Sequence, residues 1–449
     1  MILKYILIFI LNTELIRSSG LPSQKPPGVG KPLILTPYIE AGKNDEARKL
    51  SQVDPLLPGS NITSYSGFFT VDKKNNSNLF MWFFQHSSTK WYEAPLVLWL
   101  QGGPGFATMY SVFQENGPFT VIKGKLEPRK WSWTTHYNVL YIDQPVGTGF
   151  SFTDSLDYNG TQELVADHLY KALTQFFKMF PELKKTPFYT SGESYAGRYI
   201  PAISYNIHTE NANASNTKIN LKGLFLVSAM LNALQTGLCK FCYEVGIIDS
   251  KTKTKLEEKE KLIEVFFRSK MWRNASDTID ALGTDIVTIS NVTIIDYTSS
   301  SYDALNTPYV DYLQTPEIRS KIHVGNVTFI NNNEYILTHT FREDFGKGVV
   351  PWVEELIDHY RMLFVGGQFD LSVAHPVVSS NLERMSWKGA FNYSKAERKK
   401  FISDGKVVGY IKSAGNLIEV LMRNAGHMVP YYQPQATLDL LKKFINNEL

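Results

Sequence analysis

The sequence predicts an α/β fold in which a central, mostly parallel sheet has helices on both faces and carries an inserted helical cap. The first observation is a set of short apolar runs that end in glycine or a polar residue, which is typical of strands buried on both faces. The second is a helical spacing of apolar residues between some of these runs. Strands that alternate with helices favour right-handed crossovers and a parallel sheet.

The elements follow in chain order. Five runs are predicted to be parallel strands, at 95–100, 138–143, 188–191, 224–227 and 362–365. Between the second and third strands, Val165, Leu169 and Leu173 begin a helical stripe that extends to Phe180. Near the end of the chain, 406–412 and 417–422 predict a hairpin, and 434–444 predicts a closing helix.

The long stretch between the fourth and fifth strands changes in composition. It is charged and helical around 250–268, then rich in Ser, Thr and Asn around 276–301. We interpret 229–345 as a cap inserted into a core made of 21–228 and 346–449. Residues 1–20 have one early lysine, an apolar run and a small-residue end, as in a secretory signal peptide. A short buried helix is the alternative for that segment.

Sequons for N-glycosylation support entry into the secretory pathway, because a glycan needs a surface site in a secreted protein. They occur at Asn61, Asn75, Asn159, Asn213, Asn274, Asn291, Asn326 and Asn392. The predicted location is therefore extracellular or endosomal and lysosomal. No apolar run is long enough to predict a membrane span.

Composition excludes several classes of protein. The chain has 449 residues, 43% of them hydrophobic, and a net charge of +3, which gives no support for nucleic-acid binding. The basic cluster 395–400 is expected to be a solvated helix face. The two cysteines, Cys239 and Cys242, form a C-x-x-C without a thioredoxin-like pattern, so a short bridge or two inert thiols are expected rather than redox catalysis. No metal or cofactor motif is present in the sequence, and neither is predicted.

The stretch "TSGESYAGRY" is the candidate nucleophile site. The third predicted strand ends at Gly192, and apolar residues at helical spacing follow Ser194. A serine in a sharp turn between strand and helix projects above the sheet. Ala196 replaces the second glycine of G-x-S-x-G, which we interpret as a slightly looser packing of the turn. An ordinary turn serine is the alternative.

A serine hydroxyl needs a base, and the base needs an orienting acid. His427 lies in "NAGHMVP" after the last strand-like run, and Asp370 ends "MLFVGGQFD". The order Ser194, Asp370, His427 is the order found in α/β hydrolases. His375 is the nearest competitor for the base, but it has no strand to position it.

An oxyanion hole requires two backbone donors. The N–H of Tyr195, directly after the nucleophile, is the first candidate. The loop in "LWLQGGPGF" supplies the second, with Gly103 as the best candidate. A phosphate-binding loop is disfavoured because no GK[ST] follows.

The motifs "LVLWLQGGPG", "ENGPF", "LYIDQPVGTGFSF", "TSGESYAGRYIPA", "GGQFD" and "AGHMVPYYQP" together resemble the serine carboxypeptidases. The likeness covers nearly the whole chain from about Pro32 and is strongest to the vitellogenic carboxypeptidase-like branch. The resemblance implies an α/β-hydrolase fold with a helical cap and release of single C-terminal residues through an acyl-enzyme, at acidic pH. Peptide or protein C-termini would be the substrates, and a homodimer is left open.

By the same resemblance, Ser194, Asp370 and His427 are the triad. Further site residues come from the matched motifs: Gly103 and Tyr195 for the oxyanion, and Gln101, Gly102, Glu115 and Glu193 for the substrate's free carboxylate. Two carboxyls in contact cannot both ionise cheaply, so one should keep a proton and donate it to that carboxylate. A surface role for Glu115 is the alternative.

The chain also departs from the family pattern. Phe106 follows the glycine loop and is expected to narrow the substrate cleft, and Ser228 to Met230 replace a Gly-Asn/Asp-Gly stretch. Two other functions stay open from sequence alone: an acyltransferase of the same family, and a non-catalytic binding protein on the hydrolase scaffold.

Overall fold

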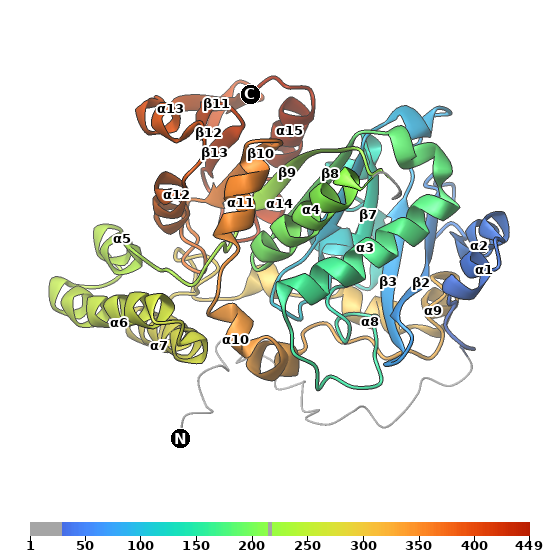
Figure 1. Cartoon of the computed structure of the whole chain (residues 1–449), viewed down its shortest axis with the longest axis horizontal. Helices are drawn as coiled ribbons and strands as arrows, with labels where there is room; N and C mark the ends of the chain where they lie inside the picture. The colour runs from blue at the N-terminus through green and yellow to red at the C-terminus, as the bar shows by residue number, and fades with distance from the viewer. Residues whose placement is uncertain (1–28, 214–217) are drawn as a thin grey trace.

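The computed structural model describes residues 29–213 and 218–449 and contains an eleven-stranded sheet flanked by helices (Figure 1). The strand order is β1-β2-β3-β7-β4-β8-β9-β10-β13-β12-β11. The six central strands, from β7 to β13, are mutually parallel, and the strands at both edges are antiparallel. The predicted α/β fold with a mostly parallel sheet is confirmed.

All five predicted parallel strands are present, as β4 Leu96–Leu100, β7 Asn138–Ile142, β8 Phe188–Glu193, β9 Leu221–Val227 and β10 Arg361–Gly367. Strand β4 shows why such runs are continuous. Leu96, Leu98 and Leu100 belong to one apolar core, and Val97 and Trp99 belong to the other. Side chains alternate between the faces of a strand, so a sheet covered on both faces needs apolar residues at every position.

The C-terminal hairpin is confirmed as β12 Lys406–Ala414 and β13 Leu417–Met422, although its turn is tighter than expected. Strand β13 also pairs in parallel with β10. The prediction of a helical face at 395–400 is wrong. Helix α13 Ala390–Lys395 ends at the first residue of this cluster, and strand β11 Lys399–Ser403 begins at its last two residues. These charges are exposed, as expected, but most lie on a loop and an edge strand.

The antiparallel N-terminal edge was not predicted. It consists of β1 Gln52–Val53, β2 Ser64–Asp72 and β3 Ser77–Phe84. All eight residues of β3 are buried, because β3 lies between β2 and β7 with both faces covered. Its run "SNLFMWFF" therefore has the same continuous apolar character as the parallel strands.

Helices cover both faces of the sheet. α3 Gln162–Met179, α4 Ala196–Ala212 and α11 Val350–Ile357 pack on one core, and α15 Pro434–Ile445 packs on the other. The predicted helix at 165–180 begins three residues earlier, since the Thr161 side chain accepts a hydrogen bond from the backbone N–H of Leu164 and caps it. The closing helix is confirmed as α15.

The stretch 229–345 contains α5 Leu238–Glu244, α6 Ser250–Arg268 and α7 Trp272–Ser290, which project beyond one side of the sheet (Figure 1). Helix α7 was not predicted, because the sequence around 276–301 is polar. It buries Leu282 and Ile286 in a small separate core. The backbones of Asn232 and Gly348 pair where the chain leaves and re-enters the core region. That pairing supports an insertion, and the limits 229 and 345 stay a prediction.

The remaining elements are short, and no helix in the described part of the chain has the length and apolar character needed to cross a membrane. Residues 1–20 lie outside the described residues. The short elements are α1 Thr36–Glu40, α2 Asn44–Ser51, β5 Phe119–Ile122, β6 Lys125–Pro128, α8 Tyr309–Gln314, α9 Pro316–Lys321, α10 Arg342–Phe345, α12 His375–Arg384 and α14 Val429–Tyr432.

Candidate active site

Ser194 lies in the turn between β8, which ends at Glu193, and α4, which begins at Ala196. Its backbone has φ 64°, a conformation that a non-glycine residue rarely adopts and that marks functional turns. Its N–H donates to Val227 O at 3.0 Å, and its carbonyl accepts from Gly197 N and Met230 N at 2.9 and 3.1 Å. The backbone on both sides therefore fixes the strained serine.

Small residues make this turn fit between β9 and the glycine loop. A Cβ atom on Gly192 would lie 2.7 Å from the Cβ of Ala196, and a Cβ on Gly197 would lie 2.6 Å from Met230 N. Gly192 therefore provides the space that the Ala196 methyl group fills. This pairing explains why alanine is accepted where the G-x-S-x-G pattern has its second glycine.

Asp370 and His427 are brought together, although 57 residues separate them. Asp370 follows β10 and His427 follows β13, two adjacent parallel strands whose carboxyl ends share one edge of the sheet. His427 Nδ1 lies 2.8 Å from Asp370 Oδ2, and Asp370 Oδ1 accepts from Val373 N at 3.0 Å. Asp370 is fully buried and His427 nearly so, so the carboxyl group is held between a backbone N–H and the imidazole ring, away from solvent.

Ser194 and His427 line the same cavity, of about 230 Å³, at this edge of the sheet. In the described part of the chain the Ser194 hydroxyl forms no hydrogen bond, as is common for a nucleophile and its base before substrate binds. His375 does not reach the cavity. It begins α12, and its Nε2 lies 3.3 Å from Glu419 Oε1 on β13, so the competing histidine has a structural partner.

The two candidate oxyanion donors also face the cavity. Gly103 and Tyr195 both line it, and neither backbone N–H donates to an acceptor among the described residues. Gly103 has φ 110°, which requires glycine. Two unpaired N–H groups beside a serine are what a developing oxyanion needs.

Gly102 presses the glycine loop against the nucleophile turn. A Cβ atom there would lie 2.5 Å from Tyr195 N and 2.8 Å from Ser194 Cβ. If Gly103 and Tyr195 are the oxyanion donors, Gly102→Ala should displace one of them and lower kcat on the order of 100-fold, the usual cost of one lost donor. KM for a short peptide should change less. Steady-state kinetics with a folded variant measures both, and an unchanged kcat would contradict the placement.

Glu115, Glu193 and Gln101 form a buried polar cluster beside the turn. The Gln101 amide nitrogen Nε2 lies 3.3 Å from Glu115 Oε2 and 3.2 Å from Glu193 Oε1. The Gln101 carbonyl Oε1 accepts from Gly102 N at 2.8 Å. Both glutamates are buried, so the alternative of a surface glutamate at 115 is wrong. Glu115 ends the π-helix Ser111–Glu115, a rare element that often marks functional sites.

Burial raises the pKa of both glutamates, and the neighbouring Glu115 raises the pKa of Glu193 further. Arg129 opposes this effect at Glu115, and Asp370 adds to it at Glu193. One buried oxygen of each carboxyl accepts no hydrogen bond from any other described residue. The two carboxyls are hydrogen-bonded to each other, which requires a proton on one of them, and Glu193 of the pair lines the cavity.

Sequence reasoning missed the group that holds the Tyr195 side chain. The Tyr195 hydroxyl donates to Asp344 Oδ2 at 2.5 Å, and Gln162 Nε2 donates to the same oxygen at 2.6 Å. Arg198 donates to the carbonyls of Asp344 and Phe345, and the Phe345 ring stacks on the Tyr195 ring at 5.6 Å. Asp344 and Phe345 thus fix the residue whose backbone N–H is a candidate oxyanion donor. No local sequence pattern signals a contact across 149 residues.

Asp143 was also missed, although it stands directly after β7. Its Oδ1 accepts from Thr108 N at 2.8 Å and its Oδ2 from Phe150 N at 2.9 Å. Thr108 Oγ1 in turn accepts from Gln101 N at 3.1 Å. Burial raises the Asp143 pKa to about 7. These hydrogen bonds position the glycine loop. The sequence signal that could have identified Asp143 is its place directly after a predicted strand.

The departures from the family pattern have local explanations. Phe106 lines the cavity, and its ring packs 5.3 Å from that of Tyr110. Ser228 has φ 44°, and its hydroxyl donates to the His427 carbonyl at 2.8 Å. The serine that replaces the usual small residue therefore helps to hold the histidine loop.

The other predicted residues lie away from this cavity. Seven sequon asparagines are exposed and Asn326 is half-buried. The eight are Asn61, Asn75, Asn159, Asn213, Asn274, Asn291, Asn326 and Asn392. Cys239 and Cys242 are buried free thiols, not a bridge, and burial raises the pKa of both, as expected for inert cysteines.

Comparison with known proteins agrees with this geometry. The profile of the serine carboxypeptidase family matches residues 55–447. The chain is 42% identical to the human (Homo sapiens) "Probable serine carboxypeptidase CPVL", over 97% of this chain and 93% of that one. It is 39% identical to the Aedes aegypti "Vitellogenic carboxypeptidase", over 96% and 93% of the two chains.

A solved structure gives the same fold. The crystal structure of the Saccharomyces cerevisiae prohormone-processing carboxypeptidase Kex1(delta)p superposes with a TM-score of 0.81 at 22% identity, and the match covers 89% of this chain and 96% of that one. The predicted resemblance and α/β-hydrolase fold are confirmed. The chain belongs to the serine carboxypeptidase family, and it is a hydrolase that acts on peptides.

Proposed function

We propose that Ser194, Asp370 and His427 form the catalytic triad of this carboxypeptidase. The observation that carries the proposal is the buried Asp370–His427 hydrogen bond at the wall of the cavity that Ser194 also lines. Asp370 would keep the proton of His427 on Nδ1, which leaves Nε2 free to accept the Ser194 hydroxyl proton.

The reaction would then proceed in two steps, acylation of Ser194 and hydrolysis of the acyl-enzyme. Ser194 Oγ attacks the last peptide carbonyl while His427 takes its proton, and the N–H groups of Gly103 and Tyr195 stabilise the oxyanion. When the intermediate collapses, the C–N bond breaks and the proton of His427 passes to the leaving amine of the terminal amino acid. Water, activated by the same histidine, then hydrolyses the acyl-serine and releases the shortened peptide.

Selectivity for a free C-terminus would come from Gln101, Gly102, Glu115 and Glu193. The raised pKa of both glutamates supports a shared proton that is donated to the substrate carboxylate. Loss of this proton at higher pH would leave negative charge facing negative charge. The arrangement favours activity in an acidic medium.

The sequons and the predicted signal peptide support a glycoprotein that enters the secretory pathway and works outside the cell or in endosomes and lysosomes. Exposure of seven sequon asparagines supports this part of the proposal. A homodimer stays a prediction, and light scattering on the purified glycoprotein tests it.

A fluorophosphonate probe tests the triad, because it labels only an activated serine. We expect stoichiometric labelling of the wild-type protein and none of Ser194→Ala, with equal thermal stability. Absence of labelling in the wild type, or equal labelling of both proteins, would contradict the triad and favour a non-catalytic binding protein on this scaffold.

The acyltransferase alternative requires a separate comparison. An N-blocked dipeptide with a free carboxylate should be hydrolysed much faster than its C-terminal amide, since only the free acid can use the glutamate pair. Equal rates, or transfer to an added alcohol in preference to water, would favour the acyltransferase.

A further inference from the structure

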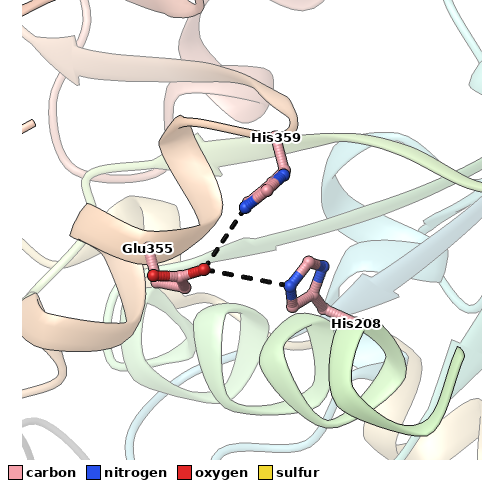
Figure 2. Close-up of side chains that lie close together, drawn as sticks. All are labelled: His208, Glu355 and His359. Carbon is pink, nitrogen blue, oxygen red and sulfur yellow. Dashed lines mark hydrogen bonds and ion pairs between the residues drawn. The ribbon is translucent and has the colours of Figure 1, made fainter. Parts of the chain in front are cut away.

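Three side chains with metal-binding atoms converge on the surface at a distance from the active site. They are His208 on α4, Glu355 on α11 and His359, which follows α11 (Figure 2). Their ligand atoms all lie within 4.8 Å of one another. Figure 2 shows both imidazole rings directing a nitrogen at one oxygen of the Glu355 carboxylate. We propose that His208, Glu355 and His359 form a zinc-binding site.

The helices dictate this convergence. Glu355 lies in the last turn of α11 and His359 in the turn directly after it, and the two side chains meet at 3.3 Å. One turn earlier on the same two helices, Tyr205 stacks on Trp352 with ring centroids 5.7 Å apart. The three groups therefore extend a packed seam between α4 and α11, and the backbone of the site is held rigidly by that packing.

The ligand set and its spacing suit zinc. Two imidazole nitrogens and one carboxylate oxygen are common zinc ligands, and a fourth position would be left for water. With bonds of about 2.0–2.1 Å, tetrahedral ligands lie about 3.4 Å apart. Glu355 Oε1 is 3.3 Å from His359 Nε2 and 4.0 Å from His208 Nε2. The second distance has to shorten, and the two histidine nitrogens, which lie within 4.8 Å of each other, have to come to a similar spacing; rotation of the imidazole rings provides both changes.

The outer contacts of His208 match those of a metal ligand. Its second nitrogen, Nδ1, lies 3.1 Å from the Tyr360 hydroxyl, and metal-bound histidines usually have such a partner to fix the ring orientation. Its side chain is 26% exposed.

A simple ion pair explains the cluster less well. A Glu355–His359 pair needs no third group, yet the His208 ring lies 4.7 Å from the His359 ring. Two imidazole nitrogens and a carboxylate oxygen that all lie within 4.8 Å of one another match the ligand set of a metal ion better than that of a single pair.

The ion would act on stability and not on chemistry. His208 stands fourteen positions after Ser194 (208 − 194), which is about 20 Å along a helix. Zinc bound there joins the helix that follows the nucleophile to the helix that follows the inserted stretch. It should raise the Tm by mass action and leave kcat/KM unchanged.

Zinc titration of the full-length glycoprotein, freed of metal by EDTA and carrying no histidine tag, tests the site. We expect about one zinc per chain by calorimetry and elemental analysis, and a Tm that rises with zinc. His208→Gln, Glu355→Gln and His359→Gln should each weaken binding by about tenfold or more, with Tm values in EDTA that show they are folded.

His339→Gln is the matched control, because His339 is an exposed histidine outside the cluster. It should bind zinc and gain stability like the wild type. If wild-type protein binds no zinc, or if the three site variants bind it as tightly as His339→Gln does, the site is excluded. The wild-type titration is decisive even if one variant fails to fold.

Discussion

Asp370→Asn should lower kcat/KM on the order of 10⁴-fold while the protein stays folded. The new amide oxygen can still accept from Val373 N, as Asp370 Oδ1 does at 3.0 Å. The amide nitrogen, however, would face His427 Nδ1, now 2.8 Å from Asp370 Oδ2. A donor there requires Nδ1 to be the acceptor, so the ring proton moves to Nε2. His427 can then no longer take the Ser194 proton.

Hydrolysis of an N-blocked dipeptide and the rate of fluorophosphonate labelling measure this loss, and thermal denaturation checks the fold. Asp311→Asn is a matched control, since Asp311 is an exposed aspartate on α8. Near wild-type activity of Asp370→Asn would remove Asp370 from the triad.

Glu193→Gln should abolish most of the pH dependence of KM for substrates with a free carboxylate. In the wild type the raised pKa of Glu193 and Glu115 keeps a proton on the pair in acid and releases it as pH rises. KM should therefore increase by about tenfold or more between about pH 5 and pH 8. This is the expected effect of losing the hydrogen bond from the glutamate pair to the charged substrate carboxylate. The glutamine amide remains a neutral donor throughout, so KM of the variant should vary much less with pH, and the change that remains comes from Glu115, whose own pKa is raised by burial.

Stability offers a second readout for the same pair. Because burial raises both pKa values above the ordinary glutamate value of 4.5, the folded state binds more protons than the unfolded state above that pH. The free energy of unfolding then falls as pH rises through the raised pKa. Glu193→Gln should flatten this decline. Glu127→Gln, at an exposed position on β6, should reproduce the wild-type curves, and an unaltered pH profile in Glu193→Gln would contradict the shared proton.

Patterns in short stretches of the sequence predicted the features that depend on neighbouring residues in the chain. Continuous apolar runs identified the central strands, because strands covered on both faces need apolar residues at every position. The positions of Ser194, Asp370 and His427 followed from their place after strand ends, since parallel strands bring their carboxyl ends to one edge. The structure brings Asp370 and His427 into contact on that edge.

Contacts between distant buried polar groups left no such pattern. Thr108 and Asp143 lie 35 residues apart, and Tyr195 and Asp344 lie 149 apart. Neither pairing has a periodicity that a single sequence can reveal. The Glu115–Glu193 pair was predicted only through the resemblance to a family. The π-helix that carries Glu115 also escaped detection, because its register depends on tertiary packing.

The hydrogen bond between the Tyr195 hydroxyl and Asp344 has a consequence for biosynthesis. A chain growing from its N-terminus contains Ser194 and both proposed oxyanion donors long before it contains Asp344, and it acquires Asp370 and His427 later still. The residues of the proposed oxyanion hole are thus synthesised first, and the proposed base His427 is synthesised last. With this order a nascent chain cannot contain the complete proposed triad until His427 has been added.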